Sequence, residues 1–260
     1  MSIESSAYRD DRLQIGGDGT PLVLVPGLDG TGQLFHRQTE LLSRSYRTAT
    51  YALRDTATTM EALVDDLLRV VDAVAGSSER AIVIGESFGG ALSLSFALAH
   101  PERVRALVII NSFPYFAPQF RLRLAIHGLR ILPWGAMPMA RRLTAFRLHS
   151  KHTHQREVRK FIAVTRSATK DGYLGRLRLL TRYDVRHRLP EVASPTLFLA
   201  AELDHLVPSL EQARYMVTRV PEATLRVLDG HGHICLISPD IDLADILHEW
   251  QDGRLSGRAP

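Results

Sequence analysis

The most constraining feature of the sequence is a strand-like segment that ends in a serine flanked by glycines. Residues 81–84 are apolar and mostly β-branched, and they lead directly into Gly85-Glu86-Ser87-Phe88-Gly89. Small and apolar residues from Ala91 to Ala99 then predict a helix. A serine at such a strand-to-helix turn has an exposed hydroxyl, and the helix behind it directs N–H groups towards that hydroxyl. The segment therefore predicts a nucleophile, Ser87, in an α/β protein.

Strand-like and helix-like segments alternate along most of the chain. Besides the strand before Ser87, strands are expected at residues 10–15, 21–25, 46–53, 104–111, 196–201 and 224–229. Further helices are expected at residues 35–42, 58–74, 209–220 and 239–250. Because strands that alternate with helices pair in parallel, the pattern predicts a mostly parallel, twisted sheet flanked by helices on both faces.

A helical, strongly basic segment interrupts this alternation. Residues 116–188 contain 17 Lys and Arg and three acidic residues, whereas the rest of the chain contains 15 basic and 25 acidic residues. We predict an α/β core of residues 1–113 and 190–260 and an inserted helical cap of residues 114–189, which packs its apolar side on the substrate cleft. The positive charge would suit an anionic lipid surface, an acyl carrier protein or an acidic ester. Nucleic acid is not expected, because no motif that reads it accompanies the charge.

The composition favours an ordinary globular protein without disulfides. The chain has one cysteine, Cys235, which is expected to be a small buried residue. No apolar run approaches the roughly 20 residues that cross a bilayer, and the polar first 18 residues lack the apolar segment of a secretion signal, so a cytoplasmic location is expected. His149, His152 and His154 lie in the basic segment and are expected to face water rather than to bind a metal.

A nucleophilic serine needs a base and a carboxylate that orients this base. Asp204 follows a predicted strand and precedes a helix, and it is favoured over Glu202, which lies closer to the strand end. His233 and His231 both follow the last predicted strand, and their spacing alone leaves either as the base.

Acyl transfer also needs donors for the negative oxygen of a tetrahedral intermediate. The amide N–H groups of Phe88, next to the serine, and of Leu28, in the glycine-rich loop after an earlier strand, are expected to form this oxyanion hole. Five further residues are expected at the substrate pocket: Gly27, Asp29, Phe113, Phe116 and Trp134.

Along most of its length the chain resembles the α/β-hydrolase superfamily. The matching residues are Pro26-Gly27-Leu28, Gly85-Glu86-Ser87-Phe88-Gly89, Asp204 with Val207-Pro208, and Gly232-His233 followed by Pro239. The resemblance implies His233 rather than His231 as the base. Two departures, Pro26-Gly27 for a frequent His-Gly and Ala201 for a frequent Gly, remove no catalytic group. More narrowly, the two glycine-rich motifs are similar to those of bacterial esterases and of the hydrolase-like part of plant phytyl ester synthases, which transfer fatty acyl groups.

These observations predict a serine carboxylic-ester hydrolase that acts on an apolar acyl ester through an acyl-enzyme, with no metal or organic cofactor. One alternative is an acyltransferase or acyl-thioesterase that recruits an acidic carrier protein or a lipid surface through the basic cap. Another is a non-catalytic binding protein with the same fold, which a complete set of catalytic residues argues against. Acyl length and alcohol preference depend on how the cap closes over the cleft and are left open.

Overall fold

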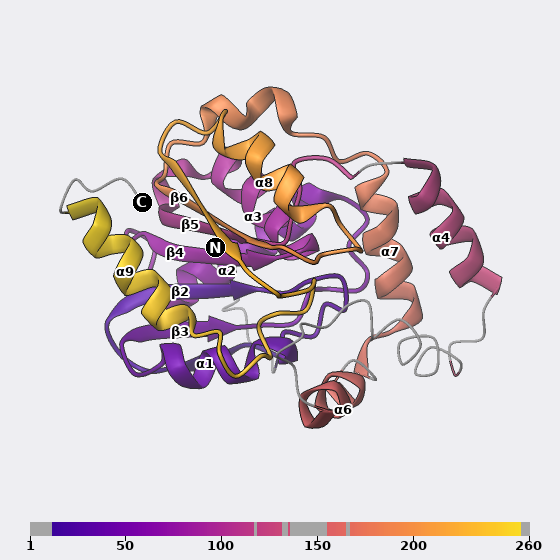
Figure 1. Ribbon diagram of the computed structural model, residues 1–260, viewed down its shortest axis with the longest axis horizontal. Coiled ribbons are helices and arrows are strands. Elements are labelled where there is room, and N and C mark those ends of the chain that lie inside the picture. Colours follow the sequence, from indigo (N-terminus) through magenta and orange to yellow (C-terminus); the bar gives the residue numbers. More distant parts are fainter. Residues whose placement is uncertain (1–11, 117–118, 132–134, 136–154, 165–166, 256–260) are drawn as a thin grey trace, which may run out of the picture.

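The centre of the molecule is a seven-stranded sheet in the order β1-β3-β2-β4-β5-β6-β7. The computed structural model describes residues 12–116, 119–131, 135, 155–164 and 167–255. The strands are β1 (Gln14–Gly16), β2 (Thr20–Val25), β3 (Tyr46–Thr50), β4 (Ala81–Glu86), β5 (Val104–Ile110), β6 (Thr196–Ala201) and β7 (Ala223–Leu228). All neighbouring strands pair in parallel except β1, which pairs antiparallel with β3. The predicted mostly parallel, twisted sheet is confirmed (Figure 1).

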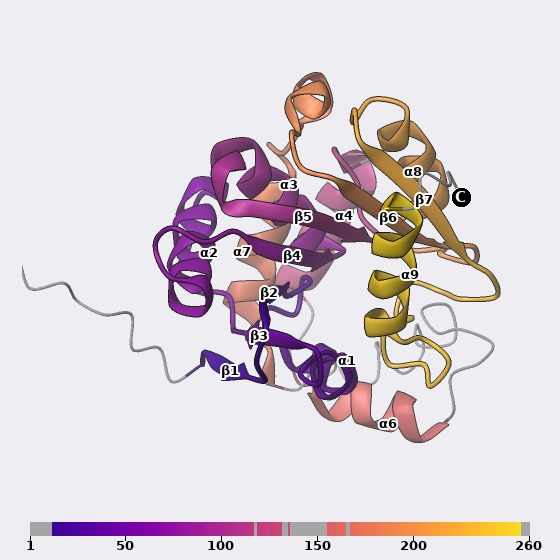
Figure 2. The same cartoon turned by 90° about the vertical axis from the view of Figure 1, so that its left-hand side faces the viewer.

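Helices cover both faces of the sheet and form two separate hydrophobic cores. The flanking helices are α1 (His36–Leu42), α2 (Met60–Ala75), α3 (Phe88–Ala99), α8 (Ser209–Val217) and α9 (Leu243–Leu255). Apolar side chains of α2, α3 and α8 pack on one face, and those of α1 and α9 pack on the other. Figure 2 shows the two layers with the twisted sheet between them.

Helix α2 lies within two residues of its expected bounds, because its start and its buried side both follow from the sequence. The Thr59 hydroxyl accepts a hydrogen bond from the Ala62 amide at 3.1 Å and caps the first turn. Apolar residues at spacings of three and four follow, and Leu63, Leu67 and Val74 are fully buried against the sheet.

Some element ends differ from those expected. The helix behind the serine starts at Phe88 rather than Ala91, because the Ser87 carbonyl accepts hydrogen bonds from the amides of Gly90 and Ala91 and so closes the first turn. The last helix starts at Leu243 rather than at residue 239, and the Asp242 side chain accepts a hydrogen bond from the Ala244 amide at its start. The strand expected at residues 10–15 is β1 at Gln14–Gly16, and residues 1–11 lie outside the described part.

The insert between β5 and β6 contains α4 (Gln119–Ile131), α6 (Gln155–Val164) and α7 (Lys170–Leu180). These helices gather at the carboxyl ends of the strands (Figure 1). Leu177 of α7 belongs to the core on the α2 and α3 side, and Phe161 of α6 packs with Leu34, Ile234 and Ile237. The insert is therefore held against loops from both halves of the sheet.

Helix α4 does not bury all its apolar residues, although the insert was expected to pack its apolar side inward. Leu122 is buried, whereas three large apolar side chains of the helix are exposed: Phe120 at 65%, Leu124 at 69% and Ile131 at 72%. Apolar residues occur on more than one side of this helix, so one set faces outward when the other packs. None of the helices in the described ranges combines the length and the apolar character of a membrane span.

Candidate active site

Ser87 lies at the turn between β4 and α3 in a backbone conformation that serine seldom adopts. Its φ is 56° and its ψ is −118°, which costs on the order of 1–3 kcal/mol and persists only when neighbours hold it. The Ser87 amide donates to the carbonyl of Ile110 at 2.9 Å, and its carbonyl accepts from the Gly90 amide at 3.0 Å and from the Ser112 hydroxyl at 2.6 Å. The ends of β5 and α3 thus fix the strained turn.

The glycines beside Ser87 are required by close approach of backbone to backbone. A Cβ on Gly85 would overlap the carbonyl oxygen of Gly89 across the turn. A Cβ on Gly89 would overlap the carbonyl oxygen of Val25 and lie 2.6 Å from that of Pro26, at the end of β2. The close approach brings the serine turn next to the glycine-rich loop that follows β2.

Replacing Gly89 by alanine is therefore expected to lower the free energy of unfolding by about 4 kcal/mol or more, a range reached only by severe overpacking or comparable defects. The matched control is Gly128→Ala in α4, where an added Cβ meets no heavy atom within 4 Å. That change is expected to stabilise the protein by about 0.5–1 kcal/mol, because alanine is the better helix former. Urea denaturation followed by circular dichroism measures both, and equal stability of the two variants would contradict the close contact.

Three side chains from distant loops form one hydrogen-bonded chain. The His233 Nε2 atom lies 3.0 Å from the Ser87 Oγ atom, and the His233 Nδ1 atom lies 2.7 Å from the Asp204 Oδ2 atom. The other carboxylate oxygen, Oδ1, accepts hydrogen bonds from the amides of Leu206 and Val207, each at 3.0 Å. These amides orient the carboxylate towards the imidazole.

The two rival residues are occupied elsewhere. Glu202 follows β6 directly, and its carboxylate accepts a hydrogen bond from the Gly230 amide at 2.9 Å. His231 lies with Nε2 at 3.2 Å from the Asp240 Oδ2 atom. In the described structure, the hydrogen-bonded partner of Ser87 is thus the second histidine of the pair.

Asn111 was not among the expected site residues, yet its side chain connects the end of β5 with the end of β6 and with the loop after β7. It has a φ of 47°, a conformation in which asparagine is enriched. Its Nδ2 atom donates to the carbonyl of His233 at 2.8 Å, and its Oδ1 atom accepts from the Ala201 amide at 2.7 Å. A polar residue directly after a buried strand is the sequence signal that could have pointed to it.

Cys235 is buried, as expected. Its Sγ atom lies 3.4 Å from the Asn111 Nδ2 atom, and burial raises the pKa of this thiol well above its ordinary value.

The loop after β2, where the oxyanion amide of Leu28 is expected, lies against the serine turn. A Cβ built on Gly27 would be 3.8 Å from the Ser87 Cβ atom. The Gly30 amide donates to the Gly27 carbonyl at 3.0 Å and closes a tight turn around Leu28. Phe88, the other expected donor, is the first residue of α3 and is buried. Both expected donors therefore flank Ser87.

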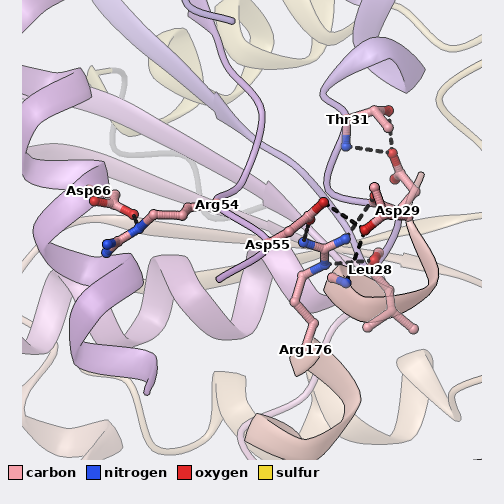
Figure 3. Close-up of polar contacts among 9 residues, drawn as sticks. Leu28, Asp29, Thr31, Arg54, Asp55, Asp66 and Arg176 are labelled. Atoms are coloured by element: carbon pink, nitrogen blue, oxygen red, sulfur yellow. Dashed lines mark hydrogen bonds and ion pairs between the residues drawn. The ribbon is translucent and has the colours of Figure 1, made fainter. Parts of the chain in front are cut away.

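Polar side chains fix this loop from two sides (Figure 3). Asp29 is buried, and its carboxylate accepts hydrogen bonds from the amide and the hydroxyl of Thr31 within the loop. The guanidinium of Arg176, in α7 of the insert, donates to the carbonyls of Leu28 and Asp29 at 2.9 and 3.0 Å. The carboxylate of Asp29 is thus held within its own loop.

Two of the three expected aromatic pocket residues, Phe113 and Phe116, pack against each other after the end of β5. Phe113 is buried and makes edge-to-face contacts with Phe116 and Tyr183, at centroid distances of 5.1 and 6.3 Å. Phe116 is half-buried, and Trp134 lies outside the described residues.

The histidine cluster at residues 149, 152 and 154 also lies outside the described residues. Among the residues that the structure describes, no group of three or more His, Cys, Asp or Glu side chains could hold a metal ion.

Glu86, the residue before the serine, is a buried carboxyl beside the hydrogen-bonded chain. Burial raises the pKa of Glu86 to about 7; His233 opposes this shift, and the charges of Asp29 and Asp204 add to it. Burial alone would lower the pKa of His233, but the charge and hydrogen bond of Asp204, together with the charge of Glu86, raise that pKa above its ordinary value. Both carboxylates therefore favour a charged imidazole.

Replacing Glu86 by glutamine is expected to change how stability depends on pH. The folded-state pKa of about 7 exceeds the unfolded value near 4.5, so the contribution of protonated Glu86 is present below pH 4.5 and is lost as the pH rises through 7. A neutral glutamine avoids this loss. The stability of the variant relative to the native protein is therefore expected to rise by up to about 3 kcal/mol between pH 5 and pH 8. Urea denaturation at both pH values measures it, and a difference that does not change with pH would contradict the expectation.

Comparison with known proteins places this chain in a family. A family model described as the alpha/beta hydrolase fold matches residues 20–240. The chain belongs to the α/β-hydrolase family. The resemblance expected from the motifs is thereby confirmed.

Among relatives of this α/β-hydrolase are bacterial proteins named "Putative carbamate hydrolase RutD". The protein from Caulobacter sp. strain K31 is 29% identical over 231 residues, which cover 83% of this chain and 84% of that one. The protein from Yersinia enterocolitica is 30% identical, over 75% of this chain and 76% of its own. A solved structure of a thermophilic esterase from Thermogutta terrifontis has a TM-score of 0.80 at 22% identity and covers 92% of each chain. That esterase has the same fold as this α/β-hydrolase. The named relatives support hydrolase activity.

Proposed function

We propose that this α/β-hydrolase cleaves carboxylic esters through a covalent acyl-enzyme. The observation that carries the proposal is the continuous hydrogen-bonded chain from Ser87 through His233 to Asp204. It combines a nucleophile, a base and a group that orients the base, and the nucleophile lies on a strained turn at the amino end of α3.

The proposed reaction uses these groups in sequence. The Ser87 Oγ atom attacks the ester carbonyl while His233 Nε2 takes its proton, and Asp204 stabilises the imidazolium that forms. The amides of Leu28 and Phe88 donate to the oxyanion of the tetrahedral intermediate. As the intermediate collapses, His233 protonates the leaving alcohol. Water then attacks the acyl-enzyme while His233 takes its proton. As the second tetrahedral intermediate collapses, His233 returns this proton to the Ser87 Oγ atom and the carboxylic acid is released.

Carbamates are the second candidate substrate, because relatives up to 30% identical are named for carbamate hydrolysis. The same nucleophile and base would form a carbamoyl-enzyme in place of an acyl-enzyme. Nitrogen donates electrons to the carbamate carbonyl, so both formation and hydrolysis of this intermediate are intrinsically slower than for an ester. The two candidates are therefore separated by the ratio of enzymatic turnovers relative to the ratio of the uncatalysed rates of the same two substrates.

The test is steady-state hydrolysis of nitrophenyl esters of increasing acyl length, alongside nitrophenyl carbamates of matched size. The proposal expects kcat/KM for the best ester to exceed that of the matched carbamate by more than the ratio of their uncatalysed rates. A smaller excess, or a higher kcat/KM for the carbamate, would favour the second candidate. Absence of turnover and of a nitrophenol burst on both substrates would overturn the serine hydrolase proposal. Product analysis with an added long-chain alcohol shows whether acyl transfer competes with hydrolysis.

A covering role for residues 114–189 and recruitment of an acidic partner are proposed as part of the same function. Support comes from the excess of positive charge between residues 116 and 188 and from Phe120 and Leu124, exposed beside Arg123 on α4. Binding to anionic lipid vesicles is expected to weaken steeply with salt, whereas hydrolysis of a short neutral ester should not. Absence of vesicle binding at low salt would eliminate the lipid partner and leave an acyl carrier protein to be tested in the same way.

A further inference from the structure

The insert reaches the oxyanion loop through one buried cation. The Arg176 side chain, on α7, is 3% exposed and makes three charge-assisted contacts (Figure 3). Its Nε atom donates to the carbonyl of Leu28 at 2.9 Å, its Nη2 atom to the carbonyl of Asp29 at 3.0 Å, and its Nη1 atom to the Asp55 Oδ1 atom at 2.9 Å. One guanidinium thus joins the loop after β2, the loop after β3 and the insert.

The surrounding residues leave room for this contact and orient its counter-ion. Gly30 has a φ of +72°, and a Cβ there would lie 2.5–2.6 Å from atoms of the guanidinium. A Cβ on Gly172 would overlap the carboxylate of Asp55. The Thr169 hydroxyl caps α7 and donates to the Asp55 Oδ2 atom at 2.7 Å. Both carboxylate oxygens of Asp55 are therefore bound by α7 and its capping residue. This ion pair uses only the Nη1 atom of Arg176, so the Nε and Nη2 atoms remain for the loop carbonyls.

The two carbonyls bound by Arg176 belong to the same turn as the proposed oxyanion donor. The hydrogen bond from the Gly30 amide to the Gly27 carbonyl fixes the peptide that precedes Leu28, and Arg176 fixes the peptide that follows it. Because a peptide unit is planar, the Leu28 N–H points opposite to the Gly27 carbonyl, which the Gly30 amide holds. Arg176 holds the next peptide, so the Gly27–Leu28 peptide cannot rotate without breaking a contact on one side of the Leu28 Cα or the other. A free loop could tilt this donor away from the oxyanion, and a misplacement of about 1 Å can cost 10²-fold in rate.

We propose that Arg176 is a positioning residue that aligns the Leu28 amide for transition-state binding and thereby makes the oxyanion hole depend on the docking of α7. This inference rests on the proposed function. It differs from a purely structural role, because a donor that binds the oxyanion acts in the transition state and its misplacement lowers kcat more than it raises KM.

The test compares Arg176→Ala and Arg176→Lys with the control Arg178→Ala, an exposed position on the same helix. On a nitrophenyl ester, Arg176→Ala is expected to lower kcat by about 10²-fold, near the cost of losing one oxyanion donor, with KM within about threefold. Arg176→Lys is expected to lower kcat by about tenfold, since an ammonium cannot reproduce the planar set of donors. Arg178→Ala should keep native values.

Chemical rescue separates positioning from stability. Ethylguanidinium added to Arg176→Ala is expected to restore a large part of kcat, whereas ethylammonium at the same concentration should restore little. A native kcat in either Arg176 variant, with or without lower thermal stability, would overturn the inference while the proposed function stands. If Arg176→Ala does not fold, the kcat of Arg176→Lys decides in the same way. If the native protein hydrolyses neither esters nor carbamates, the proposed function itself fails.

Discussion

Replacing Ser87 by alanine is expected to lower kcat on a nitrophenyl ester by about 10⁶-fold, the loss seen when a serine hydrolase loses its nucleophile. The physical reason is that alanine has no oxygen to form the acyl-enzyme, while the strained turn and the rest of the site stay in place. Stability should not fall, because the Ser87 Oγ atom lies at the end of a hydrogen-bonded chain rather than within the packed core. Steady-state kinetics and labelling by a fluorophosphonate probe measure the effect.

The matched control is Ser95→Ala, which removes a hydroxyl from the same helix, α3. The Ser95 Oγ atom donates to the carbonyl of Ala91, a contact within the helix and away from His233. This variant should retain native kcat and full labelling. Covalent labelling that survives in Ser87→Ala would show that another residue is the nucleophile, and the proposed mechanism would be wrong.

Replacing Asp204 by asparagine is expected to lower kcat by about 10⁴-fold, with little change in fold. The carboxylate accepts a hydrogen bond from His233 at Nδ1, which leaves Nε2 free to take the serine proton. An asparagine can instead donate its N–H to Nδ1, and the imidazole then carries its proton on Nε2, where it cannot act as the base. The loss should be in kcat rather than in KM, because the imidazolium forms only as the reaction proceeds.

Glu202→Gln is the matched control, since it removes a carboxylate only two residues away. Its amide can still accept the hydrogen bond from Gly230 through the side-chain oxygen, so kcat is expected to remain within a fewfold of native. If Glu202→Gln were the inactive variant and Asp204→Asn the active one, the acid would have been misassigned.

Much of the fold could be predicted because local patterns and tertiary packing agree. The apolar strands and the cap at Thr59 each have a local cause that the structure retains. Element ends were less predictable. The first turn of α3 contains Gly89 and Gly90, which disfavour helix, and only tertiary packing explains them: Gly89 lies against the end of β2 and Gly90 against the side chain of Ser112.

The residues of the candidate site that are marked by chain order or by the chemistry of a turn were predictable. Ser87 is marked by its own turn, and the order serine, acid, histidine led to the loops that hold Asp204 and His233. Arg176 could not be found in this way, and Asn111 is marked in the sequence only by its place directly after a buried strand. Asn111 acts on backbone atoms of residues 90 or more positions away, and Arg176 is one of 17 cations in a segment whose charge indicates a solvated surface. Arg176 is buried because α7 packs against the loop after β2, a tertiary contact that the sequence pattern does not indicate.

The contact between α7 and the core restricts how this protein could be recombined with its relatives. Exchanging the insert is an obvious route to new substrate preferences, since the insert begins after β5 and ends before β6. A chimera that receives a foreign insert without Arg176 would keep the space at Gly30 and the carboxylate of Asp55, and both would then lack their partner. Hybrids that transplant Arg176, Gly172 and Thr169 together with the new helices should outperform hybrids designed from the pocket lining alone.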